Sequence, residues 1–319
     1  QVIFTSGGTE ADNLAILGPL KDRGPGGRVL YSAGEHPAVI ESCKALSAYG
    51  YEVAEIALQP DGVMDIYHFE AQLTGDTRLI CVMQVNNETG AIQPLAQVSK
   101  LRDEKCPDAL LHVDGVQGFL RHDCPVQAWG IDSYALSAHK IHGPKGIGAL
   151  WVGERVRLSP ILYGGGQEKG LRSGTENTPG IAGLSAAIAS YPKEHAMRTL
   201  KLRLLERLVA GIPTLHVNGP VPDSADAADH ILNLSFAPVR AETMLHALEA
   251  ESMYAGNGSA CSSRKQRHSH VLTAMGVPRE RMESALRFSL SPDVDTAQID
   301  AAAQAIIRNY DMLKIFKRR

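Results

Sequence analysis

The stretch SYALSAHKIHGPKGIGALWV, residues 133–152, holds two apolar, β-rich runs on either side of a loop of histidines, glycines and lysines. Both runs, 133–137 and 147–152, are too uniformly apolar for half-exposed strands, which indicates a sheet covered on both faces. Lys140 directly follows the first run. Burial there would lower the pKa of its ammonium group and free the amine as a nucleophile or base. The alternatives are a solvated surface charge, or Lys145 in a more open turn as the reactive lysine.

Similar β-rich runs occur upstream, and helical patterns fall between many of them. The runs are residues 1–4, 28–32, 51–56, 78–85 and 110–114. The helical pattern at 36–50 has Pro37 near its start and Gly50 at its end, as helices often do. Alternating strands and helices predict an α/β domain with a mostly parallel sheet between helices.

The pattern changes after residue 180. A long helical stretch, residues 181–212, is interrupted near Pro192, and a proline inside a helix breaks or bends it. We therefore expect a large domain over residues 1–192 and a smaller α+β domain over 193–319. The second part has one clear strand pattern, HILNLSF, and further helices.

Composition restricts the class of protein. Hydrophobic residues make up 44% and charged residues 21%, which is typical of a globular chain. The formal charge of -3 provides no basic field for nucleic acid, so a small-molecule ligand is expected. No apolar run reaches the roughly 18 residues of a membrane helix, and no signal peptide is recognisable, which favours a cytoplasmic location. Five cysteines without C-x-x-C spacing predict reduced thiols and no metal site.

Polar loops follow several of the expected strands. They are TSGGTE, NNETG, DGVQ and SAHK, and ligands of such sheets bind beyond the carboxyl ends of the strands. In SGGT, residues 6–9, Gly8 lets the backbone approach a ligand, and the free amides at a helix start favour a phosphate. The alternative is a structural turn in which Thr9 caps the helix.

Asp114 ends the apolar run at 110–114, so its carboxylate is expected at the edge of the core, where an unpaired charge is unfavourable. A helix cap or an ordinary ion pair is the alternative for an isolated aspartate. Together, a phosphate site, a buried aspartate and a reactive lysine are the parts of a pyridoxal phosphate site. The cofactor needs an anchored phosphate, a carboxylate for its ring nitrogen and an amine for its aldehyde.

Cys261 lies in GNGSACSSR, residues 256–264, among small and polar residues, and three basic residues follow it. Positive charge nearby favours the thiolate of an exposed cysteine. The positions of the other cysteines indicate structural roles, since two lie in the expected core and two precede prolines in turns. They are Cys43, Cys81, Cys106 and Cys124.

A set of motifs along nearly the whole chain resembles the cysteine desulfurases, pyridoxal phosphate enzymes of the class V aminotransferase group. The motifs occur in family order and at similar spacing: TSGGTEADNLAI, GEHPAV, VNNETG, HVDGVQ, SAHKIHGPKGIGAL, GGGQEKGLRSGTENTP, GSACSS and LRFSL. The resemblance implies a type I aminotransferase-like fold with a large domain and a smaller C-terminal domain.

The resemblance also assigns roles to residues. Lys140 would bind the cofactor covalently, Asp114 would pair with its ring nitrogen, and His36 would stack on the ring and move protons. Considered alone, His36 near a helix start is more often a cap or a surface residue. Gly8, Thr9, Ser137 and His139 would hold the phosphate.

Other roles concern the ring hydroxyl and the substrate. Gln117 and Asn87 would contact the hydroxyl, although Asn86 is an alternative to Asn87. Arg287, in LRFSL, would hold the substrate carboxylate, with Asn87 also at the substrate. Thr175, in RSGTEN, would reach the phosphate of a neighbouring subunit, which implies a homodimer.

The implied reaction converts L-cysteine to L-alanine and leaves a persulfide on Cys261. The sulfur would then pass to an acceptor protein, either an iron-sulfur scaffold or a transfer-RNA thiolation protein. A selenocysteine lyase is the nearest rival, because the same residues would serve both substrates.

Two further alternatives remain. Family members carry a segment ahead of the first strand that is not seen here, so a truncated, non-catalytic sulfur carrier or scaffold is one. Binding of RNA through SSRKQRH, residues 262–268, is the other, although such basic runs are more often solvated loops.

Overall fold

The computed structural model describes residues 1–257 and 268–315, which form two compact units. Unit 1 comprises residues 1–57, 64–85 and 93–193, and unit 2 comprises residues 58–63, 86–92 and 194–319. The single boundary expected at residues 192–193 does not separate the two short segments 58–63 and 86–92, which group with unit 2.

Unit 1 is built on a seven-stranded sheet with the order β1-β7-β6-β5-β4-β2-β3. Neighbours from β6 to β3 pair in parallel, whereas β7 is antiparallel to both β6 and β1. All strands except β7 therefore have their carboxyl ends at one edge of the sheet. The strands are Val2–Thr5, Arg28–Ser32, Glu52–Ile56, Thr77–Cys81, Leu110–Asp114, Ser133–Ser137 and Gly148–Val152.

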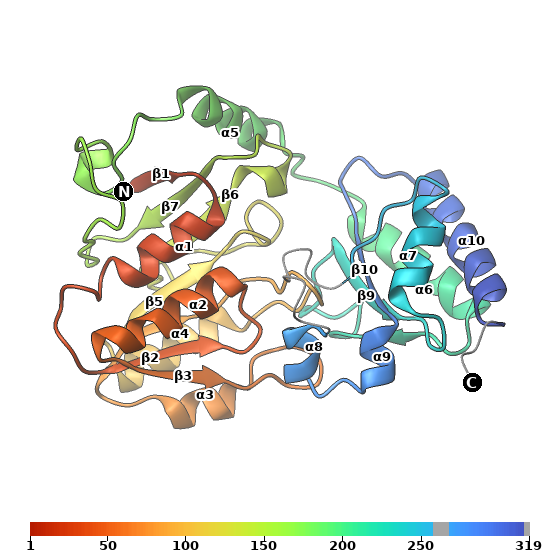
Figure 1. The fold of residues 1–319 in the computed structure, drawn as a ribbon, viewed down its shortest axis with the longest axis horizontal. Helices are drawn as coiled ribbons and strands as arrows, with labels where there is room; N and C mark the ends of the chain where they lie inside the picture. Colours follow the sequence, from red (N-terminus) through yellow and green to blue (C-terminus); the bar gives the residue numbers. More distant parts are fainter. Residues whose placement is uncertain (258–267, 316–319) are drawn as a thin grey trace. The chain divides into compact units, whose positions relative to one another are not determined.

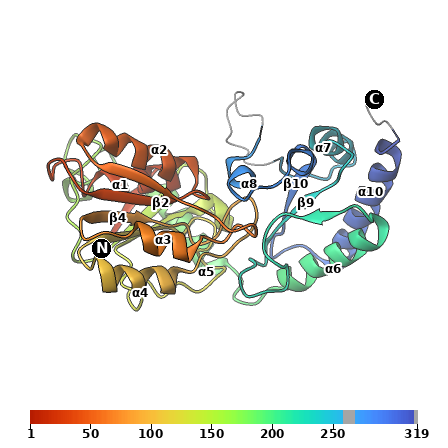
Figure 2. The same cartoon turned by 90° about the horizontal axis from the view of Figure 1, so that it is seen from below.

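Helices cover both faces of this sheet (Figures 1 and 2). One core, with Leu14, Val39 and Leu150, joins α1 and α2 to the sheet, and a second, with Phe69, Val98 and Leu184, joins α3, α4 and α5 to it. Every residue of β5 and β6 is buried as a result, including the polar His112 and Asp114 of β5. The helices are Gly8–Leu17, Pro37–Ala45, Ile66–Gln72, Leu95–Lys105 and Thr178–Ser190.

Two helix starts decide the geometry of the sheet edge. Helix α1 begins at Gly8 with Gly7 in the cap position and no capping side chain. Helix α2 begins at Pro37, and the side chain of His36 caps it. The long helical pattern near Pro192 is two helices, α5 and α6, as the proline indicated.

Unit 2 has a three-stranded antiparallel sheet with the order β10-β9-β8. Its core, with Leu204, Leu234 and Ile306, packs α6, α7 and α10 against this sheet. The strands are His216–Val217, Ile231–Ser235 and Ala285–Ser289, and the helices α6 to α10 are Met197–Gly211, Ala241–Glu249, His270–Ala274, Arg279–Glu283 and Thr296–Leu313. The α/β fold expected from the sequence, with a smaller antiparallel part, is confirmed.

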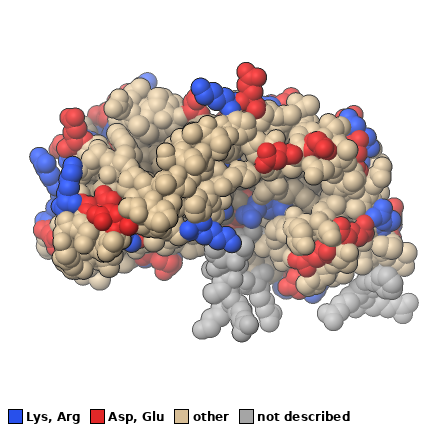
Figure 3. Space-filling model, turned by 90° about the horizontal axis from the view of Figure 1, so that it is seen from above, with Lys and Arg blue, Asp and Glu red and all other residues tan. Residues whose placement is uncertain are grey.

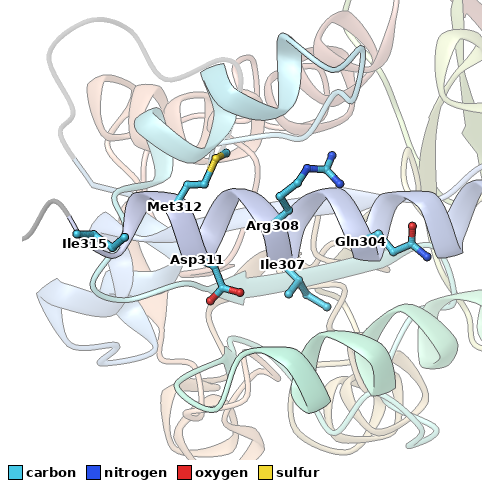
Figure 4. A pocket seen from close by; sticks show the side chains of 6 residues that line it. All are labelled: Gln304, Ile307, Arg308, Asp311, Met312 and Ile315. Atoms are coloured by element: carbon cyan, nitrogen blue, oxygen red, sulfur yellow. The ribbon is translucent and has the colours of Figure 1, made fainter.

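The surface of unit 2 has a hollow of about 590 Å³ along α10. Figure 4 shows its lining, which combines three apolar and three polar side chains: Gln304, Ile307, Arg308, Asp311, Met312 and Ile315. On the molecular face in Figure 3, Lys and Arg are interspersed with Asp and Glu. Across the described residues, no helix is long and apolar enough to cross a membrane.

Candidate active site

Most of the expected site residues of unit 1 follow strands whose carboxyl ends share one sheet edge. Gly8 and Thr9 start α1 after β1, and His36 follows β2. Asp114 is the last residue of β5, and Ser137 is the last residue of β6. Lys140 lies in the short 3-10 helix η2, Ala138–Ile141, directly after β6. The topology thus brings these residues to the edge where α/β sheets bind ligands.

The start of α1 provides a cradle for an anion. A Cβ atom on Gly8 would lie 2.7 Å from Cγ2 of Val116 and 3.8 Å from Cβ of Ser137, so only glycine lets the backbone approach this closely. Because no side chain caps the helix, its first amides are available to a phosphate. The alternative in which Thr9 caps α1 is wrong, since Gly7 occupies that position.

Ser137 and His139 lie next to this cradle and contact each other. The Oγ atom of Ser137 is 2.7 Å from Nδ1 of His139. Burial lowers the pKa of His139, and the charges of Lys140 and Lys145 lower it further. A neutral ring at this position has one N–H group, which can donate to an acceptor such as a phosphate oxygen, and one nitrogen that accepts.

Asp114 is 5% exposed and its Oδ1 accepts a hydrogen bond from the backbone N–H of Val116, 2.9 Å away. Burial raises the pKa of Asp114 to about 7 and the charge of Asp12 adds to this, while the Val116 amide, His112 and Lys140 oppose it. The carboxyl group caps no helix. Lys140 is a cation whose charge already acts on this carboxyl group. A cationic partner would therefore stabilise its charged form.

Lys140 is partly buried, and Arg121 holds its backbone. The guanidinium of Arg121 donates to the carbonyl oxygen of Lys140, and also to that of Gln117 at 3.2 Å. Its Nε donates to Oη of Tyr191 at 3.1 Å. The rival, Lys145, is exposed. The position of Lys140 is thus more enclosed than that of a surface charge.

His36 caps α2, as the structural alternative proposed. Its Nδ1 accepts a hydrogen bond from the backbone N–H of Ala38, 3.1 Å away. Since Nδ1 is an acceptor, the neutral ring carries its proton on Nε2. Capping does not exclude a role at the sheet edge, because the second ring nitrogen remains outside the cap.

In unit 2, two of the expected residues lie together. Nη1 of Arg287, on β10, donates to the backbone oxygen of Asn87 at 2.8 Å. The side-chain oxygen of Asn86 accepts from the amides of Glu88 and Thr89, each at 2.9 Å, so Asn86 holds the turn together. This favours Asn87 over Asn86 as a ligand-binding residue. Cys261 and the basic run 264–267 lie outside the described residues.

Comparison with known protein families shows to which family the chain belongs. A model of the family "Aminotransferase class-V" matches residues 1–302. The chain belongs to the class V aminotransferase family.

Within this family, the relatives that match the chain are cysteine desulfurases. The "Cysteine desulfurase" of Nostoc sp. is 38% identical over 96% of this chain and 76% of its own length. The "Cysteine desulfurase IscS" of Methanosarcina thermophila is 39% identical over 92% of this chain and 74% of its own length. This class V aminotransferase is accordingly a pyridoxal-phosphate-dependent enzyme of the cysteine desulfurase group.

Solved structures agree. A "NIFS-LIKE PROTEIN" matches with a TM-score of 0.88 and 31% identity, covering 98% of this chain and 83% of its own. DndA from Streptomyces lividans matches with a TM-score of 0.74 and 39% identity, covering 91% of this chain and 83% of its own. The resemblance to cysteine desulfurases and the expected fold are therefore confirmed.

The residues of the class V aminotransferase fit its cofactor chemically. Free amides at α1 and the close approach at Gly8 suit the phosphate, the buried Asp114 suits a cationic ring nitrogen, and the amine of Lys140 would suit the aldehyde. Gln117 lies in the loop after β5, three residues beyond Asp114. Thr175 is exposed between β7 and α5.

Several residues that shape the site were not found from the sequence. Arg121 donates a hydrogen bond to the backbone of Lys140, and Asp12 is hydrogen-bonded to His112, which lies two residues before Asp114 on β5. In sequence, Arg121 resembles any polar loop residue and Asp12 resembles a polar position in the first helix. Only the H-x-D spacing of His112 and Asp114, which puts both on one face of β5, was available as a signal.

Proposed function

We propose that the chain converts L-cysteine to L-alanine and takes up the sulfur as a persulfide on Cys261. The observation that carries this proposal is the buried Asp114, on which the charge of Lys140 acts and which lies at the same sheet edge as Lys140 and the uncapped start of α1. That combination is suited to a cofactor with a cationic ring nitrogen, an aldehyde and a phosphate.

When bound, pyridoxal phosphate supplies an electron sink for the bonds at Cα of an amino acid. Lys140 would hold the cofactor through its amine, and the same amine would move the proton at Cα of the substrate. Asp114 keeps a proton on the ring nitrogen through charge pairing. His36, with Nε2 as its proton-bearing nitrogen, stacks on the ring and takes part in proton movement.

Binding and orientation come from other side chains. Gly8, Thr9, Ser137 and His139 hold the phosphate, while Gln117 and Asn87 contact the ring hydroxyl. Arg287 binds the substrate carboxylate with its planar set of donors, and the hydrogen bond to the Asn87 carbonyl orients its guanidinium next to Asn87.

Cys261 performs the sulfur transfer. Its thiolate attacks the substrate sulfur, the bond between that sulfur and Cβ breaks, and the electron pair stays with Cβ, which takes up a proton. One thiol and L-cysteine thus give one persulfide and L-alanine, without an external oxidant. The persulfide sulfur then passes to an acceptor protein of iron-sulfur cluster assembly or transfer-RNA thiolation.

We also infer a homodimer and a cytoplasmic location. Thr175 is exposed between β7 and α5, which is compatible with its assignment to the phosphate of a neighbouring subunit. The four cysteines within the described residues are free, in keeping with a reducing compartment.

The first experiment concerns Lys140. The purified protein loaded with pyridoxal phosphate should show a visible absorption band from the lysine-bound cofactor, and Lys140→Ala should lose both this band and alanine formation. Lys145→Ala is the matched control and should keep both. An unchanged band in Lys140→Ala would refute the assignment.

The second experiment concerns Cys261 and the substrate. Cys261→Ser should keep the visible band but form no protein persulfide from L-cysteine. Sulfide release at the rate of the unchanged protein would exclude Cys261 as the sulfur acceptor. Turnover of L-selenocysteine should be compared with that of L-cysteine, and a preference for the selenium substrate would favour the lyase instead.

A further inference from the structure

Three carboxyl groups lie in the interior of unit 1, close enough to affect each other. They are Asp12 in α1, Glu35 after β2 and Asp114 at the end of β5, and they are 1%, 1% and 5% exposed. The charges of Asp12 and Asp114 both raise the pKa of Glu35, which burial raises first. Three buried carboxyl groups in one region cannot all be ionised at moderate energetic cost.

Asp12 is bonded to His112. The two atoms Oδ1 of Asp12 and Nε2 of His112 are 3.3 Å apart, and both side chains are buried to 1% exposure or less. Nδ1 of His112 is 2.9 Å from Oγ of Ser133, its neighbour on β6. Since His112 and Asp114 are two residues apart on β5, they point to the same face of the sheet.

The proton between Asp12 and His112 can lie on either partner. An ion pair would put a carboxylate and an imidazolium in the interior, whereas a neutral pair keeps the proton on Asp12. Burial raises the pKa of Asp12 to about 8 and lowers the pKa of His112 to about 4, so both groups favour the neutral pair. In that state the Asp12 hydroxyl donates to Nε2, and Nδ1–H donates to Ser133.

The groups that face Asp12 are consistent with this state. They are His112, Asp114, Glu35 and the thiol of Cys81, while the charge of Lys140 acts on Asp114. An ionised Asp12 would repel the charge of Asp114, whose pKa it raises. A neutral Asp12 removes that repulsion.

We propose that Asp12 is a protonated, neutral acid in the resting protein. The hydrogen-bonded series of Asp12, His112 and Ser133 is then uncharged, and Asp114 is the charged carboxyl group that contacts the cofactor. Asp12 and His112 are then positioning residues that act through Asp114. The link to the cofactor rests on the function proposed above, whereas the protonation of Asp12 does not.

The direct test uses the cofactor-free protein. Infrared difference spectra between the unchanged protein and Asp12→Asn at neutral pH should show the loss of one protonated carboxyl band and no loss of a carboxylate band. Loss of a carboxylate band would overturn the proposal. Because no cofactor is present, this result does not depend on the proposed function.

Stability against pH gives a second readout. A carboxyl group whose pKa is raised in the folded state stabilises the protein fully below its unfolded pKa of about 3.9, and this contribution is lost as the pH rises towards 8. Asp12→Asn stays neutral at every pH. The free energy of unfolding of the cofactor-free variant should therefore fall less steeply than that of the unchanged protein between about pH 4 and pH 8. An equal or steeper fall would contradict a neutral Asp12.

Cofactor binding connects the pair to Asp114. Asp12→Asn should keep the affinity for pyridoxal phosphate, whereas Asp114→Asn should lose about tenfold or more, the change that one pKa unit of stabilisation represents. If Asp12→Asn lost as much affinity as Asp114→Asn, a charged Asp12 would be needed and the proposal would fail. If the unchanged protein bound no pyridoxal phosphate, the proposed function would fail while the infrared result stood.

Discussion

The guanidinium of Arg121 donates a hydrogen bond to the backbone carbonyl oxygen of Lys140. The same side chain also donates to the carbonyl of Gln117, and its guanidinium carbon lies 5.9 Å from the ring centre of Tyr191. Arg121 therefore connects the loop after β5, which carries Gln117, to the loop after β6, which carries Lys140. Anchoring of this kind fixes the backbone from which the Lys140 amine extends.

Replacement of Arg121 should weaken cofactor binding through Lys140. A hydrogen bond from a charged group contributes about 1.5–3 kcal/mol, so Arg121→Met should reduce the affinity for pyridoxal phosphate by about tenfold or more. Tyr191→Phe removes only the acceptor of Nε and should have a smaller effect. Titration of the visible band measures both. An Arg121→Met protein with unchanged affinity and only a lower free energy of unfolding would show that the anchor is structural.

His36 has two separable tasks, because it caps α2 and carries the ring proposed to act on the cofactor. Asparagine is a good cap but has no imidazole, so His36→Asn should keep the free energy of unfolding of the cofactor-free protein within a few tenths of a kcal/mol. His36→Ala should lower it by about 1 kcal/mol. Both variants should lose alanine formation. Full activity in His36→Asn would mean that the ring has no chemical role.

Local patterns in the sequence predicted those parts of unit 1 that a segment specifies by itself. The runs 110–114 and 133–137 are β5 and β6, because strands buried on both faces lack the regular alternation of polar and apolar residues that a half-exposed strand shows. The run 78–85 was too long, since β4 ends at Cys81. The amides of Val82 and Gln84 still donate to carbonyl oxygens of His112 and Asp114, so this apolar stretch is buried without continuing the strand.

Features that depend on distant parts of the chain could not be predicted in this way. The Asp12–His112 contact joins residues 100 positions apart, and a charged residue in a helix normally indicates a solvated face. Strand β10 was not predicted as a strand, because ALRFS has no clear alternation of polar and apolar residues. Only the family motif around Arg287 identified this segment. The antiparallel direction of β7 follows from the turn after Lys140, which the residue pattern alone did not define.

Alanine should be tolerated at position 8 only if the neighbouring Val116 is replaced by a smaller residue. The added Cβ would lie 2.7 Å from Cγ2 of Val116, which is closer than side chains approach one another, so Val116 or the start of α1 must move. Overpacking of this kind costs about 1–3 kcal/mol, and Gly8→Ala should bind pyridoxal phosphate about tenfold more weakly. The double variant Gly8→Ala with Val116→Ala should recover most of this affinity. Val116→Ala alone is the control, and no recovery in the double variant would mean that the backbone amides, not the packing, were disturbed.

Arg287 should determine the affinity for the substrate and leave the cofactor unaffected. Its Nη1 donates to the carbonyl of Asn87, and a lysine at this position would keep the charge but lose the planar pair of donors that matches a carboxylate. We expect Arg287→Lys to raise KM for L-cysteine by about tenfold, in line with the loss of one charge-assisted hydrogen bond, with an unchanged visible band. Arg281→Lys is the matched control, because Arg281 donates to Val217 and Asn218 within the same unit, and it should alter stability but not KM. Equal effects of the two substitutions on KM would show that Arg287 supports the fold of β10 and does not bind the carboxylate.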